Sequence, residues 1–169
     1  MNAAKLESII GYRFRNIDLL ERALTHRSWT HENRRSESDN ESLEFLGDSV
    51  LGLAIAEHLF TEFPDAAEGE LTQMKHRLVS MPTLASIASS IGLGDFIGLG
   101  RGEEASGGRE KPAILADALE AVIGAVFIDG GYIEARSFIV RLFRPELKRI
   151  APDRVADHKS RLQELLDRK

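Results

Sequence analysis

The stretch that decides the fold runs from Glu41 to Phe63 and reads ESLEFLGDSVLGLAIAEHLFTEF, directly before Pro64. Its apolar residues recur at intervals of three and four, which predicts an α-helix. Proline ends a helix at the residue before it, so the helix is expected to stop at Phe63. Apolar side chains surround nearly the whole circumference of this helix, and we therefore expect it to lie at the centre of the domain.

A second apolar run extends from Ala113 to Ile128, after Pro112 and before Gly130-Gly131. Proline is tolerated at the start of a helix and glycine favours its end, so this run predicts a second central helix. The run is too short to span a membrane, and it carries Asp117 and Glu120. Since no segment alternates with a period of two and no internal repeat is present, the fold class is predicted to be all-α.

Shorter helices are expected around these two. They cover residues 6–10, 17–24, 72–80, 84–91 and 132–150, the last with a possible break at Pro145. Met81-Pro82-Thr83 is expected to mark a boundary before the helix at 84–91. Residues 26–40 are polar and predict a partly structured connection, whereas the glycine-rich and charged residues 94–111 predict a loop with at most one short helix.

Composition limits the classes of function. The 169 residues contain no cysteine, which excludes disulfides, zinc-thiolate sites and cysteine nucleophiles. The segment Met1–Gly11 has no features of a secretory signal, so a cytoplasmic protein without a membrane segment is expected. The net charge of −5 counts against a nucleic-acid partner. That objection weakens if metal ions offset the carboxylates or if a basic module is missing from this chain.

Three carboxylates share one face of the first central helix. Glu41, Glu44 and Asp48 are spaced so that all three fall within a sector of about 60°. A solvated acidic stripe is the ordinary alternative, but such a stripe usually carries Lys or Arg partners, and none lies on this face. Burying an unpaired carboxylate costs several kcal/mol, so these acids need a counter-charge.

The second central helix repeats this feature, because Asp117 and Glu120 are the only charges between Ala113 and Ile128. If the acidic faces of the two helices meet, five oxygen-donating side chains converge. Hard divalent cations such as Mg²⁺ or Mn²⁺ are the natural counter-charge for such a set. The pattern therefore indicates metal-assisted hydrolysis of a phosphodiester, with water as the nucleophile.

The segment Glu41–Ser49, ESLEFLGDS, closely resembles the signature segment of the ribonuclease III family. The similarity continues in the family's order over nearly the whole chain, from about residue 6 to residue 150. The supporting blocks are Leu24–Ser28, Glu68–Leu71, Ser106–Gly108 and Leu115–Ala125.

This resemblance implies a set of site residues. The four carboxylates of the catalytic metal cluster would be Glu44, Asp48, Asp117 and Glu120. Glu41 and Glu68 match the family's two accessory acids, Glu41 nearer the scissile phosphate or the dimer interface and Glu68 assisting outer-shell water or a second metal. Ser42 departs from the longer polar or basic residue that is frequent in the family, which is expected to affect the rim of the site. None of the four central acids is substituted.

The resemblance also implies a homodimeric endonuclease fold and an Mg²⁺-dependent activity, with Mn²⁺ as a substitute and no small-molecule cofactor. The substrate would be double-stranded RNA, including precursor rRNA and messenger RNA, cut to 5′-phosphate and 3′-hydroxyl ends. Two alternatives remain: an RNA-binding or assembly protein that has lost cleavage, and a metal-dependent hydrolase of a small phosphorylated substrate. Duplex cleavage and nucleotide hydrolysis assays distinguish them.

Several individual roles stay open. Phe45 is either an ordinary core residue or, as the resemblance implies, part of the dimer interface. His26 is predicted to form structural hydrogen bonds rather than to act in catalysis. Basic residues that are candidates for RNA contact are Lys75, Arg77, Arg101, Arg109 and Lys111. Residues 1–150 are predicted to form the catalytic domain, and residues 151–169 resemble a linker and the first helix of an incomplete double-stranded-RNA-binding domain.

Overall fold

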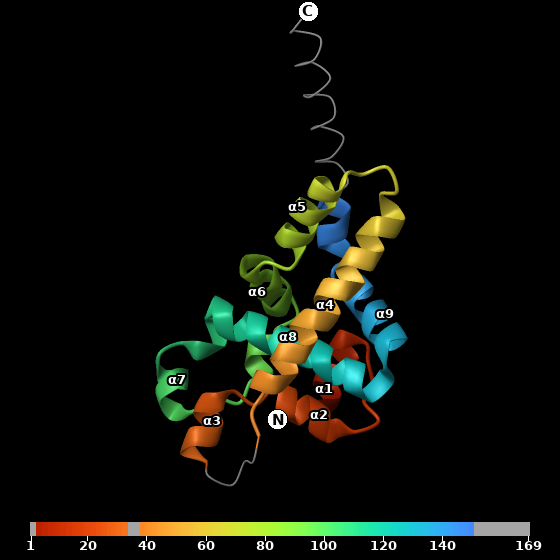
Figure 1. The fold of residues 1–169 in the computed structure, drawn as a ribbon. Coiled ribbons are helices and arrows are strands. Elements are labelled where there is room, and N and C mark those ends of the chain that lie inside the picture. The colour runs from red at the N-terminus through yellow and green to blue at the C-terminus, as the bar shows by residue number, and fades with distance from the viewer. Residues whose placement is uncertain (1–2, 34–37, 151–169) are drawn as a thin grey trace, which may run out of the picture.

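The computed structural model describes residues 3–33 and 38–150, and over these ranges it contains helices and no named strand (Figure 1). The all-α prediction is confirmed. The elements are α1 (Ala3–Ile10), α2 (Ile17–Ala23), α3 (Arg27–Glu32), α4 (Glu41–Glu62), α5 (Glu68–Leu78), α6 (Met81–Ser90), η1 (Leu93–Phe96), α7 (Arg101–Ala105), η2 (Gly108–Glu110), α8 (Pro112–Gly130) and α9 (Tyr132–Leu142). The predicted linker and tail, residues 151–169, lie outside the described residues.

The two predicted central helices, α4 and α8, pack against each other and cross in the middle of the molecule (Figure 1). Helices α2, α6 and α9 pack against α8, and α9 also contacts α4. Helix α8 is buried on nearly every side, and Leu119 and Ile123 have no exposed surface. Burial of each such side chain stabilises the fold by about 1.5–3 kcal/mol. None of the helices in the described part has the length and apolar character that crossing a bilayer requires.

Glycines let the backbones of α4 and α8 touch. A Cβ atom added at Gly47 of α4 would lie only 1.8 Å from the carbonyl oxygen of Glu120. A Cβ atom at Gly124 of α8 would lie 2.3 Å from the carbonyl oxygen of Leu43. Real Cβ atoms do not approach so closely, so no larger residue fits at either position without separating the helices. This close approach sets how near the side chains of the two helices can come.

Three helices begin earlier than the sequence predicts, the first of them α1, which starts at Ala3 rather than residue 6. Helix α5 starts at Glu68 rather than residue 72, since the backbone N–H of Ala67 donates to Glu70 Oε2 at 3.0 Å and closes the first turn. Helix α6 starts at Met81, so the expected boundary at Met81-Pro82-Thr83 is wrong. Proline removes no helical hydrogen bond in the first turn, and Pro82 therefore fits inside the helix.

The segment at 94–111 is more ordered than a loop with one short helix, because α7 is flanked by the two 3₁₀ turns η1 and η2. Hydrogen bonds and ion pairs of its charged side chains stabilise this segment. Lys111 Nζ lies 2.5 Å from Glu103 Oε1, and Arg109 Nη1 donates to the carbonyl oxygens of Gly94 and Ile97 at 2.8 and 2.9 Å. The break expected at Pro145 falls at residue 143, after which the backbone is again helical over 144–150.

Candidate metal centre

Three carboxylates converge where α4 and α8 cross. Glu44 of α4 and Asp117 and Glu120 of α8 each offer a carboxylate oxygen, and these three oxygens lie within 4.8 Å of one another. Asp117 and Glu120 are one turn apart on α8, and Glu44 is one turn before Gly47, so the close helix crossing brings these turns together. An all-oxygen set of this spacing suits a hard divalent cation.

The carboxylates of this cluster resist ionisation together. Burial raises the pKa of Glu120 to about 7, and the charges of Asp48, Glu44 and Asp117 act in the same direction. Burial also raises the pKa of Glu44, with added repulsion from Asp117 and Glu41. The pKa of Asp117 is raised by burial as well. A divalent cation would relieve this repulsion and displace protons from the cluster.

The other acids with a predicted role lie around or away from this cluster. Asp48 is exposed and outside the group of three, yet its charge acts on Glu120 more strongly than any other carboxylate. Glu41, the first residue of α4, forms an ion pair with Arg27 at 3.3 Å. Asp48 and Glu41 thus border the cluster, but neither belongs to the group of three carboxylates that lie within 4.8 Å of one another.

The structure does not bring Glu68 into the cluster of this chain. Glu68 is the first residue of α5, which begins just beyond the end of α4 at Glu62, and it accepts a hydrogen bond from Thr72 Oγ1 at 2.9 Å. Asp48 lies about 21 Å before the end of α4, at 1.5 Å per residue. The role of Glu68 therefore remains a prediction that rests on the resemblance alone.

His26 and Arg27 approach the cluster from α3. The Nδ1 atom of His26 accepts a hydrogen bond from the backbone N–H of Ser28 at 3.2 Å and so caps the helix. Burial lowers the pKa of His26, which agrees with an acceptor nitrogen and a structural role. Burial raises the pKa of both Glu44 and Asp117, and the charge of Arg27 opposes this rise at each of them. Sequence reasoning missed Arg27, although it stands inside the family-like block Leu24–Ser28.

Two of the basic residues considered for RNA contact hold other partners. Lys111 is paired with Glu103, and Arg109 Nε lies 2.6 Å from Glu104 Oε1. Both side chains therefore stabilise the segment between η1 and α8. Arg101 begins α7 and is exposed.

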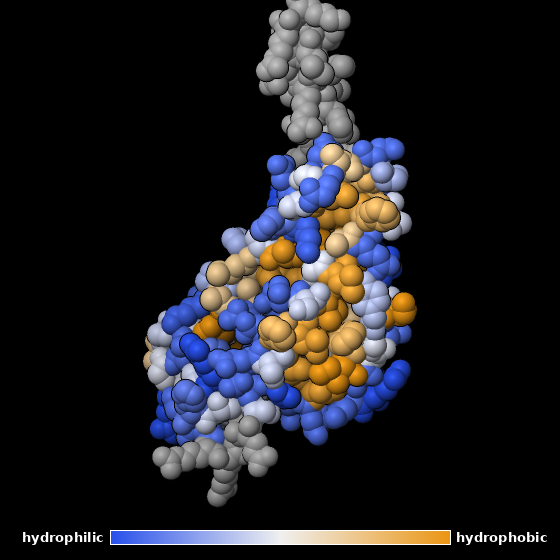
Figure 2. All heavy atoms as spheres, viewed as in Figure 1, coloured by the Kyte–Doolittle hydropathy of each residue, from blue (hydrophilic) through white to orange (hydrophobic). Residues whose placement is uncertain are grey.

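An apolar stripe runs along the outer side of α4. Phe45, Leu53 and Phe60 are 77%, 57% and 72% exposed and fall within a sector of about 80° on the helix. Figure 2 shows hydrophobic side chains gathered over the central part of the molecule. The interpretation of Phe45 as a core residue is wrong within this chain. This α4 stripe, defined by the three residues above, lies beside the acidic face of the same helix.

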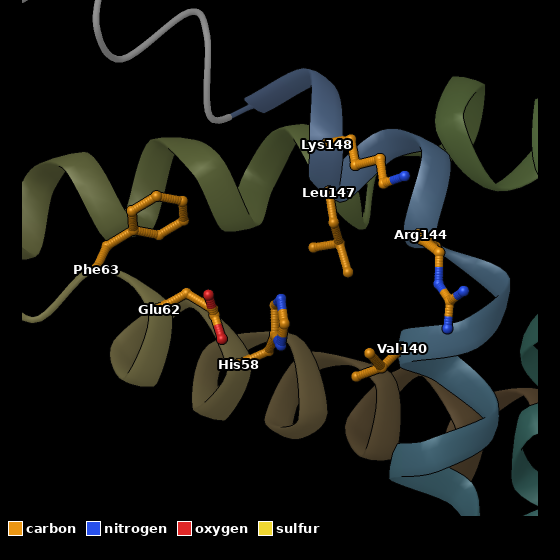
Figure 3. A pocket seen from close by; sticks show the side chains of 7 residues that line it. All are labelled: His58, Glu62, Phe63, Val140, Arg144, Leu147 and Lys148. Carbon is orange, nitrogen blue, oxygen red and sulfur yellow. The ribbon is translucent and has the colours of Figure 1, made fainter.

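A cavity of about 540 Å³ lies between the C-terminal half of α4 and the segment from α9 to residue 148 (Figure 3). His58 and Glu62 approach it from α4, and Val140 approaches it from α9. Its lining includes none of the carboxylates of the cluster. The candidate metal centre is therefore a separate site at the crossing of α4 and α8.

Comparison with known proteins gives a consistent relationship. Residues 16–147 match the family described as Ribonuclease-III-like. The Ribonuclease 3 of Nitratidesulfovibrio vulgaris is 48% identical over 95% of this chain and 64% of that protein. The Ribonuclease 3 of Oleidesulfovibrio alaskensis is 47% identical over 97% of this chain and 72% of that protein. This chain thus spans only part of the length of either relative.

Solved structures show the same similarity. The nuclease domain of ribonuclease III from Campylobacter jejuni matches with a TM-score of 0.80 at 44% identity, over 85% of this chain and 97% of that chain. Dicer from Pichia stipitis matches with a TM-score of 0.58 at 27% identity, over 81% of this chain and 58% of that chain. The helical arrangement around α4 and α8 therefore agrees with that of solved nuclease domains.

Proposed function

We propose that this chain, which belongs to the ribonuclease III family, is a divalent-metal-dependent endonuclease that hydrolyses double-stranded RNA. The observation that carries this proposal is the convergence of Glu44, Asp117 and Glu120 at the crossing of two helices that pack together through buried apolar residues. Carboxylates in such surroundings destabilise the fold unless a cation offsets them. Their retention is understandable if they bind that cation.

The donor set fits Mg²⁺, with Mn²⁺ as a substitute. The three clustered residues offer oxygen ligands only, and Asp48 adds a fourth carboxylate at the edge. When bound, the metal supplies Lewis-acid activation of water and of the scissile phosphate. Glu44, Asp117 and Glu120 would hold and orient the cation, and Asp48 and Glu41 would add negative charge at the border of the cluster. Hydrolysis leaves 5′-phosphate and 3′-hydroxyl ends.

We further propose that the protein acts as a homodimer through the α4 stripe. The stripe is about 22 Å long, and a second copy that covers it would shield its exposed apolar side chains from water. The related Campylobacter jejuni nuclease domain is described as flexible in a region involved in dimer formation. Because the acidic face adjoins the stripe on α4, a dimer places two metal centres along one substrate, one for each strand.

The proposed cellular role is processing of structured RNA, including precursor rRNA and messenger RNA, in the cytoplasm. Residues 1–150 would supply the catalytic domain. Residues 151–169 would begin a double-stranded-RNA-binding domain, which agrees with relatives that are longer than this chain.

The test is cleavage of a labelled RNA duplex in Mg²⁺, with single-stranded RNA and a nucleotide as parallel substrates. Duplex cleavage that stops on addition of a chelator is the expected result. Nucleotide hydrolysis with an intact duplex would instead favour the small-substrate hydrolase. Duplex binding without cleavage at any metal concentration would favour the binding protein.

A further inference from the structure

We propose that Arg27 contacts a backbone phosphate of the RNA beside the metal centre and positions the strand for hydrolysis. This inference rests on the proposed function and assigns a substrate contact to a residue of α3. Its basis is the combination of an anchored backbone, an exposed guanidinium and a location next to the carboxylate cluster.

The backbone on both sides of Arg27 is fixed. Before it, the N–H of His26 donates to the carbonyl oxygen of Gly98 at 3.1 Å, and the His26 side chain caps α3. After it, Ser28 Oγ accepts a hydrogen bond from the N–H of Gly100 at 2.9 Å. Both neighbours are therefore attached to the segment before α7. The side chain of Arg27, in contrast, is 64% exposed.

The guanidinium of Arg27 lies at the edge of the carboxylate cluster and is only lightly engaged. Its Nη1 atom is 3.3 Å from Glu41 Oε1, and the Glu41 side chain is itself 56% exposed. Exposed ion pairs of this kind are weak, and a guanidinium has five N–H donors, so other donors stay accessible to a ligand. The charge of Arg27 also reaches Glu44 and Asp117, where it favours the ionised carboxylates.

A phosphodiester that approaches this site meets strong repulsion. The carboxylates gathered there are Glu41, Glu44, Asp48, Asp117 and Glu120. A bound metal offsets part of this charge, but the neighbouring phosphates of the strand also need a cation. The planar guanidinium matches phosphate oxygens in a two-pronged arrangement. Arg109 and Lys111 form ion pairs with Glu104 and Glu103, whereas the guanidinium of Arg27 is largely exposed to solvent beside the cluster.

The experiment measures RNA binding and metal binding separately in Arg27→Ala. Binding of a short labelled duplex in Ca²⁺ should weaken about tenfold at about 0.15 M salt, as expected when one charge-assisted hydrogen bond is removed. The slope of log K against log[salt] should become shallower by about one for each phosphate that is no longer neutralised. Mn²⁺ binding without RNA, followed by electron paramagnetic resonance, should tighten, because a cation has been removed from beside the carboxylates.

Arg149→Ala is the matched control. Arg149 is 68% exposed and forms an ion pair with Glu146 at 2.7 Å, but it lies beyond α9. Its removal should change neither the salt slope nor Mn²⁺ affinity. Arg27→Lys keeps the charge without the planar fork, so it should restore the Mn²⁺ affinity of the parent and only part of the RNA affinity.

The outcomes separate this inference from the function on which it rests. If the parent chain cleaves duplex RNA while Arg27→Ala keeps the parent's affinity and salt slope, Arg27 makes no phosphate contact and the inference is overturned alone. Weaker Mn²⁺ binding in Arg27→Ala would also overturn it, since that result indicates that Arg27 holds the carboxylates in place rather than contacting RNA. A parent chain that neither binds nor cleaves duplex RNA overturns the proposed function, and the inference with it.

Discussion

Two groups of carboxylates in this molecule have opposite surroundings. In the segment before α8, Glu103 lies 2.5 Å from Lys111, whose hydrogen bond and charge hold the pKa of Glu103 below its ordinary value. At the crossing of α4 and α8, Glu44, Asp117 and Glu120 face one another, and each has a raised pKa. Paired carboxylates secure a connecting segment. Clustered carboxylates weaken the fold when they are ionised, and a cation from outside the chain would offset that cost.

The largest expected difference between the two groups is in catalysis. Glu120→Gln should lower Mg²⁺-dependent cleavage of duplex RNA by about a thousandfold or more, because several kcal/mol of transition-state stabilisation depend on the positioned metal. Glu103→Gln removes the same charge from the paired group and should leave cleavage near that of the parent. Single-turnover rates at saturating enzyme measure both. Full cleavage by Glu120→Gln at ordinary Mg²⁺ would remove Glu120 from the metal centre.

The next effect concerns the helix crossing that creates the cluster. Gly47→Ala should destabilise the fold by about 3 kcal/mol or more, since its Cβ would lie 1.8 Å from the carbonyl oxygen of Glu120 and the helices must separate. Gly69→Ala in α5 is the control, because a Cβ there meets nothing within 4 Å. That change lies in the first turn of α5 and should alter stability by no more than about 0.5 kcal/mol. Urea unfolding measures the free energy of unfolding of both variants and of the parent. A Gly47→Ala variant as stable as the Gly69→Ala variant would refute the close crossing.

A third effect tests the surface beside the cluster. If the proposed dimer forms through the α4 stripe, Phe45→Glu should convert it to a monomer, because covering a charge in place of an apolar side chain costs about 2–3 kcal/mol for each protomer. Cleavage should fall strongly because the second centre is then absent. Ile9→Glu, on α1 and 43% exposed, should leave the dimer intact. Sedimentation velocity measures both, and an unchanged dimer with Phe45→Glu would leave the interface unassigned.

The sequence was sufficient for the two central helices because their apolar runs and terminal prolines and glycines are local signals. Spacing also placed Asp117 and Glu120 on one face. The close approach of Gly47 and Gly124 to the facing helix was not predictable, since a glycine within a helix weakens it locally and its benefit depends on the backbone of a distant helix. Arg27 was missed for a related reason: its importance arises from charges that the fold brings from α4 and α8.

The predicted helix starts at residues 72 and 84 were late because they relied on apolar periodicity. The true first turns contain Glu68 and Pro82, which periodicity does not detect. Glu68 shows a different limit. Its proposed role came from the resemblance, and the fold of one chain places it beyond the far end of α4 from the cluster. The order of residues 94–111 depends on ion pairs between side chains several residues apart, such as Lys111 with Glu103.

The smallest expected effect is a pH dependence of stability that distinguishes the cluster from the paired group. Burial raises the pKa of Glu120 to about 7 from the ordinary 4.5, so between these values the folded state binds a proton more tightly than the unfolded state. Stability should therefore fall as pH rises through this window and level off above about 7. Because Glu120 is only half-buried, solvent screening reduces the decrease to about 1–2 kcal/mol.

Saturating Mg²⁺ should act in the opposite direction, since it binds the deprotonated carboxylates and stabilises the folded state more as pH rises. Urea unfolding at about pH 5, 7 and 8, with and without Mg²⁺, measures both trends in the parent chain and in Glu120→Gln. The variant should show a smaller metal-free fall, carried by the raised pKa values of Glu44 and Asp117 alone, and a slope as steep as that of the parent would show that Glu120 does not carry the proton.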